Sequence, residues 1–272
     1  MIKADCHLHS KFSPDSQENF ENIIASAKNR GLKRIYFTDH YEYNNPCLPD
    51  PKDWLDLERY QSTLHSLHAQ HKNELDIRLG IEFGMQPEIK EHLNEIAKKY
   101  PFDFIIGSSH TIGGNDVGFD ATEYAKGKNQ FQFYQGYFEE ILACIENFDS
   151  FDVYGHIDYI IRYGKYETKD VDMKAHHDIL EEIFKKLIAK GKGIELNTSG
   201  IRYKLSQFHP KKEILQLYRS LGGEIITIGS DAHRAVDIGF EFSTAENLLQ
   251  EVGFKYYTLF EKRKPTFHKL GQ

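Results

Sequence analysis

Hydrophobic and polar positions along the chain fall into two kinds of segment that follow one another repeatedly. Short apolar runs, rich in β-branched and aromatic residues, are each followed by a polar loop and then by a stretch with apolar residues at helical spacing. This order is typical of βα units joined into a mainly parallel sheet. The runs lie at residues 1–9, 33–40, 76–83, 102–110, 151–158, 192–199 and 223–233.

The stretches between the runs carry helix boundary signals. Residues 19–31 end in glycine, and residues 87–101 open with proline and close at another, as crossover helices do. Residues 174–193 and 210–223 repeat this arrangement, with glycine just past the expected helix end. A further β-prone segment, residues 256–267, leaves an eighth strand open, because no helix follows it and no ligand-like residue ends it.

Tandem βα units with right-handed crossovers can close into a barrel, whose strand ends then converge on one cavity. The units number about seven, so the pattern predicts an α/β, TIM-like barrel. A chain of 272 residues can form such a barrel as one domain, and no linker, repeat or low-complexity tract indicates a second one. We therefore expect a single domain over residues 1–272.

Composition narrows the possible partners. The net charge is −7 and the basic residues are scattered, which disfavours nucleic acid as a ligand. The three cysteines, Cys6, Cys47 and Cys144, lack C-x-x-C spacing and are expected to be free thiols in a reducing compartment. No leader sequence and no long apolar run is present, so we expect a cytoplasmic protein without a membrane span. Nothing indicates an oligomeric state.

Imidazole and carboxylate groups end six of the seven runs, where barrel enzymes carry their chemistry. His7 and His9 share a face of an extended strand, and Asp231 and His233 repeat that spacing. With one acid from the first loop, the candidate ligands are His7, His9, Asp15, His40, Glu82, His110, His156, Asp231 and His233. Nitrogen and oxygen ligands favour zinc, manganese or iron, and nine of them imply several ions. The alternative, isolated strand-end polar residues, fits the joint positioning less well.

The remaining histidines are assigned structural or surface positions. Three of them lie on a polar helical pattern and are expected on a solvated face: His65, His68 and His71. His176 and His177 are adjacent in a helical stretch and should point apart. The lone residues His92, His209 and His268 are expected at the surface.

The motifs HLHS, TDH, GIEF, SSH, GHID and GSDAH occur in that order. With them the chain resembles the PHP family, named for polymerase and histidinol phosphatase, and in particular its histidinol-phosphate phosphatases. The resemblance covers nearly the whole chain and implies a distorted (β/α)7 barrel with three divalent ions at its C-terminal rim. It also implies that the first ion takes His7, His9, Glu82 and Asp231, the second Glu82, His110 and His156, and the third Asp15, His40 and His233. Some members of the family carry histidine where this chain has Asp15, which leaves the occupancy of the third position open.

Paired ions about 3.5–4 Å apart lower the pKa of water and clamp a phosphoryl group, so phosphate ester hydrolysis is the expected reaction. Arg162 and Arg202 follow strand ends, and their guanidinium groups match phosphate oxygens, although each can instead be a surface ion pair. Asp231 or His233 is the candidate for moving a proton to the leaving alkoxide. Asn197 either orients substrate or caps a helix.

Several acids near the motifs are candidates for supporting roles. Asp5, Asp39 and Asp158 are expected to hydrogen-bond the outer ring nitrogens of ligand histidines. Residues 41–51 and 111–124 form long loops of the kind that cover active sites. The acids in and beside these loops that could contact a cationic substrate are Glu42, Asp116 and Asp120.

The leading hypothesis is a phosphomonoesterase for a small substrate, which the resemblance identifies as L-histidinol phosphate in histidine biosynthesis. A nuclease or phosphodiesterase of the same family is the second hypothesis, but it would need a basic groove. A metal hydrolase for a non-phosphate substrate, resembling amidohydrolases, is the third. A catalytically silent, metal-stabilised module that binds a partner is the fourth, and the intact ligand set argues against it.

Overall fold

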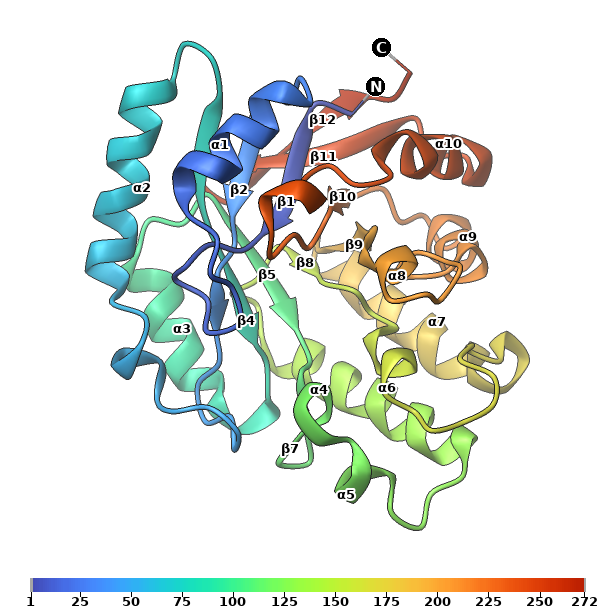
Figure 1. Ribbon diagram of the computed structural model, residues 1–272. Coiled ribbons are helices and arrows are strands. Elements are labelled where there is room, and N and C mark those ends of the chain that lie inside the picture. Colours follow the sequence, from blue (N-terminus) through green and yellow to red (C-terminus); the bar gives the residue numbers. More distant parts are fainter. Residues whose placement is uncertain (1, 272) are drawn as a thin grey trace.

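Seven parallel strands, hydrogen-bonded in chain order, form the framework of this computed structural model, which describes residues 2–271 (Figure 1). They are β1 (Ala4–Leu8), β2 (Arg34–Phe37), β4 (Asp76–Gly84), β5 (Phe104–Ser108), β8 (Val153–Tyr154), β9 (Gly193–Asn197) and β10 (Ile226–Gly229). A parallel bridge between Leu8 and Ala232 joins the end of β1 to the segment after β10. The sheet is thus nearly closed, which confirms the predicted seven-stranded, TIM-like barrel.

Helices connect the strands and surround the barrel (Figure 1). The longer ones are α1 (Phe20–Asn29), α2 (Leu57–His71), α3 (Lys90–Lys99), α6 (Gln130–Asn147), α7 (Met173–Ala189), α9 (Lys212–Ser220) and α10 (Phe242–Val252). Helix α1 begins after Asn19, whose side chain accepts from the Asn22 backbone N–H, and Asp172 caps α7 in the same way. All four helices expected from the sequence are present.

Short elements lie in the loops at the carboxyl ends of the strands. They are β3 (His40–Tyr41), β6 (Thr111–Ile112), β7 (Asn115–Asp116), α4 (Val117–Asp120), α5 (Thr122–Ala125), α8 (Ser199–Arg202) and 3-10 turns at Pro51–Asp53, Pro87–Ile89, Tyr159–Arg162 and Ala235–Asp237. Strand β3 pairs with β4 and extends the barrel wall toward the rim. These loops therefore carry ordered structure that can hold side chains in place.

The β-prone segment near the C-terminus is not an eighth barrel strand. It forms an antiparallel hairpin of β11 (Tyr256–Glu261) and β12 (Lys264–Lys269), a separate two-stranded sheet. The hairpin turn contacts the residues that directly precede β5 and β8, at the end of the barrel opposite the candidate site. There, Arg263 Nε donates to Asp152 Oδ2 at 2.5 Å. The hairpin thus covers the amino-terminal end of the barrel.

Apolar side chains from the strands and the inner helix faces form one core. Cys6 and Leu8, which alternate with His7 and His9 in the sequence, are buried in this core, as the alternation of a strand requires. All three cysteines are free thiols, of which only Cys47 is exposed. Among the described residues, no helix is both long and apolar enough to cross a membrane.

Candidate metal centre

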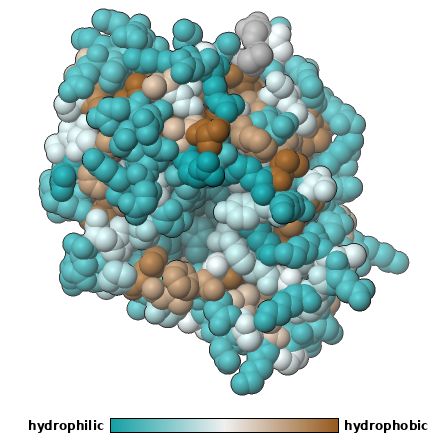
Figure 2. Space-filling view, in the orientation of Figure 1, coloured by the Kyte–Doolittle hydropathy of each residue, from teal (hydrophilic) through white to brown (hydrophobic). Residues whose placement is uncertain are grey.

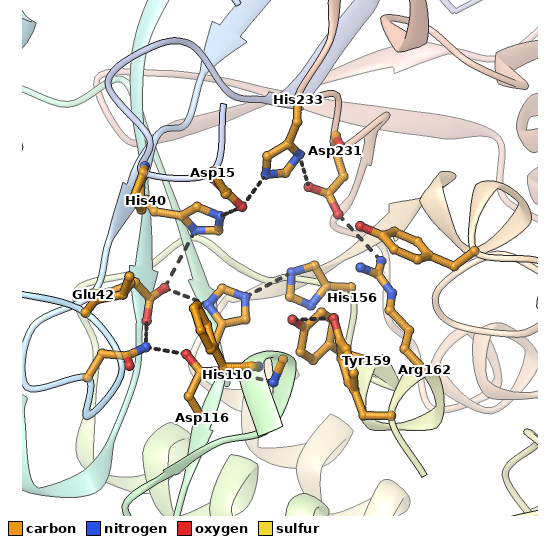
Figure 3. A pocket seen from close by; sticks show the side chains of 17 residues that line it. Asp15, His40, Glu42, His110, Asp116, His156, Tyr159, Arg162, Asp231 and His233 are labelled. Carbon is orange, nitrogen blue, oxygen red and sulfur yellow. Dashed lines mark hydrogen bonds and ion pairs between the residues drawn. The ribbon is translucent and has the colours of Figure 1, made fainter. Parts of the chain in front are cut away.

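The nine predicted ligand residues meet at the carboxyl ends of the strands, around a cavity of about 420 Å³. Six of them line the cavity and are labelled in Figure 3: Asp15, His40, His110, His156, Asp231 and His233. His7, His9 and Glu82 lie below them and are fully buried. The cavity opens in the hollow near the centre of Figure 2, where hydrophilic side chains predominate. Residues from all parts of the chain thus share one pocket.

Four of these residues form a first group at the base of the site. His7 Nε2 lies 3.1 Å from His9 Nε2 and 3.2 Å from Glu82 Oε2. Asp231 Oδ1 completes the group, 3.4 Å from His9 Nε2 and 3.7 Å from His7 Nε2. Ligands bound to one zinc ion at 2.0–2.1 Å lie roughly 3.3 Å apart in a tetrahedron, so this spacing fits a shared cation.

A second group uses the other oxygen of Glu82. Glu82 Oε1 lies 3.0 Å from His156 Nε2 and 3.5 Å from His110 Nε2, and the two imidazole nitrogens are 3.5 Å apart. One carboxylate therefore faces both groups, with Oε2 toward the first and Oε1 toward the second. This geometry suits a carboxylate that bridges two cations.

A third group lies nearer the cavity mouth. Asp15 Oδ2 is 2.9 Å from His233 Nε2 and 3.5 Å from His40 Nε2. The Asp15 side chain is 53% exposed, whereas every residue of the first two groups is buried. His40 also approaches the first group, since its Nδ1 lies 2.9 Å from Glu82 Oε2. The third group is thus the most accessible to solvent.

The ionised carboxylate of Glu82 favours the binding of cations at the site. Burial alone would raise the pKa of Glu82, but His7, His40 and His110 hold it well below its ordinary value. Glu82 Oε2 is buried and has no hydrogen-bond donor among the described residues, although three imidazole nitrogens surround it. An orphaned, ionised oxygen among nitrogen ligands is a position that a cation fills.

Asp231 is held in a strained conformation. Its φ is 53°, in the left-handed region, which costs roughly 1–2 kcal/mol for a residue with a Cβ. Its backbone N–H donates to the His7 carbonyl at 2.8 Å. Burial would raise the pKa of Asp231, but His7, His9 and His233 keep it well below its ordinary value. Backbone strain of this kind is commonly found at functional sites.

Glu195, which the sequence interpretation missed, supports the first two groups. Its Oε1 lies 2.7 Å from His7 Nδ1, and its Oε2 accepts from the His156 backbone N–H at 3.0 Å. The signal was present in the sequence, because a glutamate inside a buried strand requires partners. Gly229 of β10 leaves room for this contact, since a Cβ there would overlap with Glu195 and His7.

Glu42 has a comparable position behind His110. Its Oε1 lies 2.6 Å from His110 Nδ1, and Gly84 leaves the space that its carboxylate fills. Glu42 also lines the cavity, so the contact with a cationic substrate that the sequence suggested is still open to it. In the structure its nearest partner is the imidazole of a candidate ligand. Such a contact fixes the tautomer and ring direction of the histidine.

The three aspartates expected behind ligand histidines behave differently. The prediction is wrong for Asp5, which accepts from Ser230 and Gly239 instead. It is also wrong for Asp158, which binds the imidazole of His209. Asp39 acts indirectly, because Ser13 Oγ lies 2.8 Å from Asp39 Oδ1 and 3.0 Å from His9 Nδ1. Asp39 thus supports a candidate ligand through one hydroxyl.

The two candidate phosphate contacts have different surroundings. Arg162 is 8% exposed and lines the cavity, with its Nη2 3.5 Å from Asp231 Oδ2. Arg202 is not among the cavity-lining residues, and it donates to the carbonyls of Ser230 and Asp231 at 2.7 Å each. Asn197 Oδ1 accepts from the Ser199 N–H at 3.0 Å, although the N-cap residue of α8 is Thr198. Only Arg162 is placed to meet a ligand directly.

The remaining histidines lie outside the candidate ligand groups. His65 is exposed, while His68 and His71 are half-buried. His176 is buried and His177 exposed, so they diverge as expected, and His92 and His268 are half-buried. The surface position predicted for His209 is wrong, because its side chain is fully buried between Asp158 and Arg162.

The two long loops do contribute walls to the cavity. Asn45 from the first loop donates to Asp116 Oδ2 of the second at 2.7 Å, and both residues line the cavity. Phe119 on α4 also lines it and is 71% exposed. Asp120, another candidate substrate contact, is exposed and lies outside the lining. The loops are thus tied together over one side of the site.

A parallel barrel that gathers nine candidate nitrogen and oxygen ligand residues at its carboxyl rim has the architecture of TIM-like barrels that carry out metal-assisted chemistry. Residues 5–199 match the PHP domain. The chain belongs to the PHP family.

The relatives are of similar length to this chain. It is 33% identical over 265 residues to the histidinol-phosphatase of Lactococcus lactis, covering 97% of this chain and 96% of the relative. It is 32% identical over 259 residues to a Clostridium acetobutylicum protein named "Probable histidinol-phosphatase", covering 95% and 97%. The crystal structure of the Lactococcus lactis histidinol phosphate phosphatase, complexed with zinc, L-histidinol and phosphate, superposes with a TM-score of 0.90 at 31% identity. That superposition covers 97% of this chain and 98% of the other.

Proposed function

We propose that this protein is a metal-dependent phosphomonoesterase that hydrolyses L-histidinol phosphate to L-histidinol and phosphate, a step of histidine biosynthesis. The observation that carries the chemistry is the position of Glu82, whose two oxygens face two separate groups of imidazoles. The substrate follows from the Lactococcus lactis relative, which matches this chain over nearly its whole length and binds L-histidinol and phosphate.

The centre holds three divalent ions in this proposal. His7, His9, Glu82 and Asp231 would hold the first ion, Glu82, His110 and His156 the second, and Asp15, His40 and His233 the third. Zinc is supported by the relative's structure, and manganese or iron would use the same nitrogen and oxygen ligands. When bound, the ions would lower the pKa of water and neutralise phosphate oxygens.

The protein's own residues then bind the ester and move protons. The Arg162 guanidinium binds a non-bridging phosphate oxygen through a charged N–H group, which makes a strong hydrogen bond to an anion. A new bond forms between a water oxygen and phosphorus while the ester P–O bond breaks. Asp231 and His233, both at the cavity wall, are the groups that can pass the released proton to the leaving alkoxide.

The cavity wall formed by the two long loops suits the amino group of the substrate. Glu42 and Asp116 lie there, linked through Asn45, and their negative charge attracts the cationic amino group of L-histidinol. An extended nucleic acid would instead require a basic groove, and the net charge of the chain is −7. The cytoplasmic location and the single domain expected from the sequence stay predictions.

The test is hydrolysis of L-histidinol phosphate by the zinc-loaded protein, compared with sugar phosphates and dinucleotides. We expect a clear preference for L-histidinol phosphate and near loss of activity in His110→Ala, because His110 is a ligand of the second group. Equal rates across the panel would show that the substrate assignment is wrong. Activity that survives both chelation and His110→Ala would contradict the metal-dependent mechanism.

A further inference from the structure

A buried chain of polar side chains runs behind the cavity wall, from Asp158 through His209 to Arg162. Asp158 Oδ1 lies 2.5 Å from His209 Nδ1, and Arg162 Nε donates to His209 Nε2 at 3.0 Å. Asp158 and His209 are fully buried, and Arg162 is 8% exposed. Each ring nitrogen of His209 therefore has one partner, a carboxylate on one side and a guanidinium on the other.

We propose that His209 is a positioning residue that fixes the direction of the Arg162 guanidinium toward the phosphate of the substrate, with Asp158 fixing the tautomer of His209. This inference rests on the proposed function, because it takes Arg162 as the phosphate contact. It adds two residues, Asp158 and His209, that do not touch the cavity themselves.

The hydrogen-bond chemistry allows only one arrangement of protons. A guanidinium can only donate, so His209 Nε2 must accept from Arg162 Nε. The proton of the neutral ring is then on Nδ1 and is donated to Asp158. Burial lowers the pKa of His209, which favours this neutral form. A protonated ring would have no lone pair for Arg162.

The other contacts of Arg162 leave one nitrogen for a ligand. Arg162 Nη2 donates to Ser199 Oγ at 2.5 Å and lies 3.5 Å from Asp231 Oδ2. Within residues 2–271, Nη1 has no hydrogen-bond partner, although Arg162 lines the cavity. The rings of Tyr159 and Tyr203 lie 4.8 and 4.1 Å from the guanidinium carbon. Two nitrogens are thus anchored and the third is free.

The segment that carries His209 is itself anchored on both sides. His209 exchanges backbone hydrogen bonds with Asn197 at the end of β9, at 2.6 and 2.9 Å. The Lys211 backbone N–H donates to Asp158 Oδ2 at 3.1 Å, so the carboxylate binds two positions of the same segment. A rigid support of this kind can hold a guanidinium within the narrow range that phosphate recognition needs.

The experiment compares two amides at position 209 in the zinc-loaded, full-length protein. The amide of glutamine lies where Nε2 lies, so His209→Gln keeps an acceptor for Arg162. The amide of asparagine lies where Nδ1 lies, so His209→Asn keeps a donor for Asp158 but cannot reach Arg162. We expect His209→Asn to lower kcat/KM roughly ten- to 100-fold and to weaken binding of inorganic phosphate about tenfold. His209→Gln should retain most of the wild-type kcat/KM and most of the wild-type affinity for phosphate.

A purely structural role for His209 would change both amide variants alike. Zinc content and melting temperature are measured for each variant, and His176→Asn serves as the matched control. His176 is also buried, with its Nδ1 3.2 Å from Gln135 Oε1, and it lies outside the cavity lining. This control should lose stability without a change in phosphate affinity.

A double-mutant cycle with Arg162→Ala then tests whether His209 acts through the arginine. We expect His209→Asn to have little further effect on phosphate binding in the Arg162→Ala background. An equal loss in both backgrounds, or equal losses in the asparagine and glutamine variants, would overturn the inference. Phosphate binding is measured by calorimetry without turnover, so failure to hydrolyse L-histidinol phosphate would refute the proposed function and leave this test intact.

Discussion

His7 and Glu195, 188 residues apart in the sequence, meet at 2.7 Å at the base of the site through Nδ1 and Oε1. The contact leaves His7 Nε2 directed at the first ligand group, 3.2 Å from Glu82 Oε2. A carboxylate on the outer nitrogen of a ligand histidine fixes its tautomer and raises its basicity. In the proposed metal site, Glu195 would thus support a ligand histidine without being a ligand itself.

Replacing Glu195 with glutamine should weaken zinc binding roughly ten- to 100-fold. All the groups that face the carboxylate are donors in this arrangement, namely His7 Nδ1, the His156 N–H and Asn197 Nδ2, and one amide has only one acceptor. Competition with a zinc-binding dye measures the change. Asp152→Asn is the control, because Asp152 is a buried carboxylate at the other end of the barrel. Equal zinc affinity in the Glu195 variant and the wild type would contradict this role.

Gly229→Ala should also disrupt the contact between His7 and Glu195, because it adds a Cβ next to both side chains. A Cβ at Gly229 would overlap with Glu195 and with His7, and neither can withdraw from the buried strand ends. Overpacking of this kind costs about 1–3 kcal/mol of stability, and we expect zinc affinity to fall with it. Denaturant unfolding of the zinc-free and zinc-loaded forms separates the two effects. A loss of stability with unchanged zinc affinity would show that the His7–Glu195 contact survives.

The sequence predicted the nine candidate ligand residues because nearly all of them lie at strand ends, whereas their division into three groups came from the family resemblance. The i, i+2 spacing places His7 with His9, and Asp231 with His233, and the parallel order of the barrel brings the strand ends together. The prediction for Asp5, which relied on regular alternation along the strand, was wrong because the pairing of β1 with β2 shifts register between Asp5 and Leu8. Asp5 consequently reaches the segment after β10 rather than a ligand imidazole.

Contacts that depend on tertiary structure alone could not be predicted from the sequence pattern. His209 lies in a loop without periodicity, and its partner Asp158 is 51 residues away, so nothing local marked it as buried. Arg202 looked equivalent to Arg162 because both follow strand ends. Only the three-dimensional structure shows that the guanidinium of Arg202 is occupied by two backbone carbonyls.

Removal of the metal ions should abolish activity and lower the stability of the fold. An ion that binds only the native state contributes about 4 kcal/mol when its free concentration is about 1,000 times the Kd. Chelation should therefore lower the melting temperature, and added zinc should restore it. Ligand imidazoles must be deprotonated, so zinc should be lost more readily near pH 5 than near pH 8. A melting temperature unaffected by chelation would contradict the proposal.

The two arginines should differ in what their replacement changes. Arg162→Ala removes a charged contact to phosphate and should lower kcat/KM roughly ten- to 100-fold, with weaker inhibition by phosphate. Arg202→Ala frees the carbonyls of Ser230 and Asp231 and should lower zinc content and stability instead. Steady-state kinetics with elemental analysis distinguish these outcomes. A direct phosphate contact by Arg202 would appear as weaker phosphate inhibition with full zinc content.

In the proposed three-ion centre, Asp15 would hold the third ion. Its Oδ2 lies 2.9 Å from His233 Nε2 and 3.5 Å from His40 Nε2, and its loss removes the carboxylate of the third group. The first two groups share Glu82 and do not use Asp15, so Asp15→Ala should release one zinc ion per chain and retain the bridged pair. Elemental analysis after dialysis measures the loss, with Asp120→Ala as the control because Asp120 is exposed and outside the cavity lining. If Asp15→Ala kept the zinc content of the wild type, the third ion would have to be bound elsewhere or not at all. A drop to no zinc would show instead that the groups bind their ions as one cooperative unit.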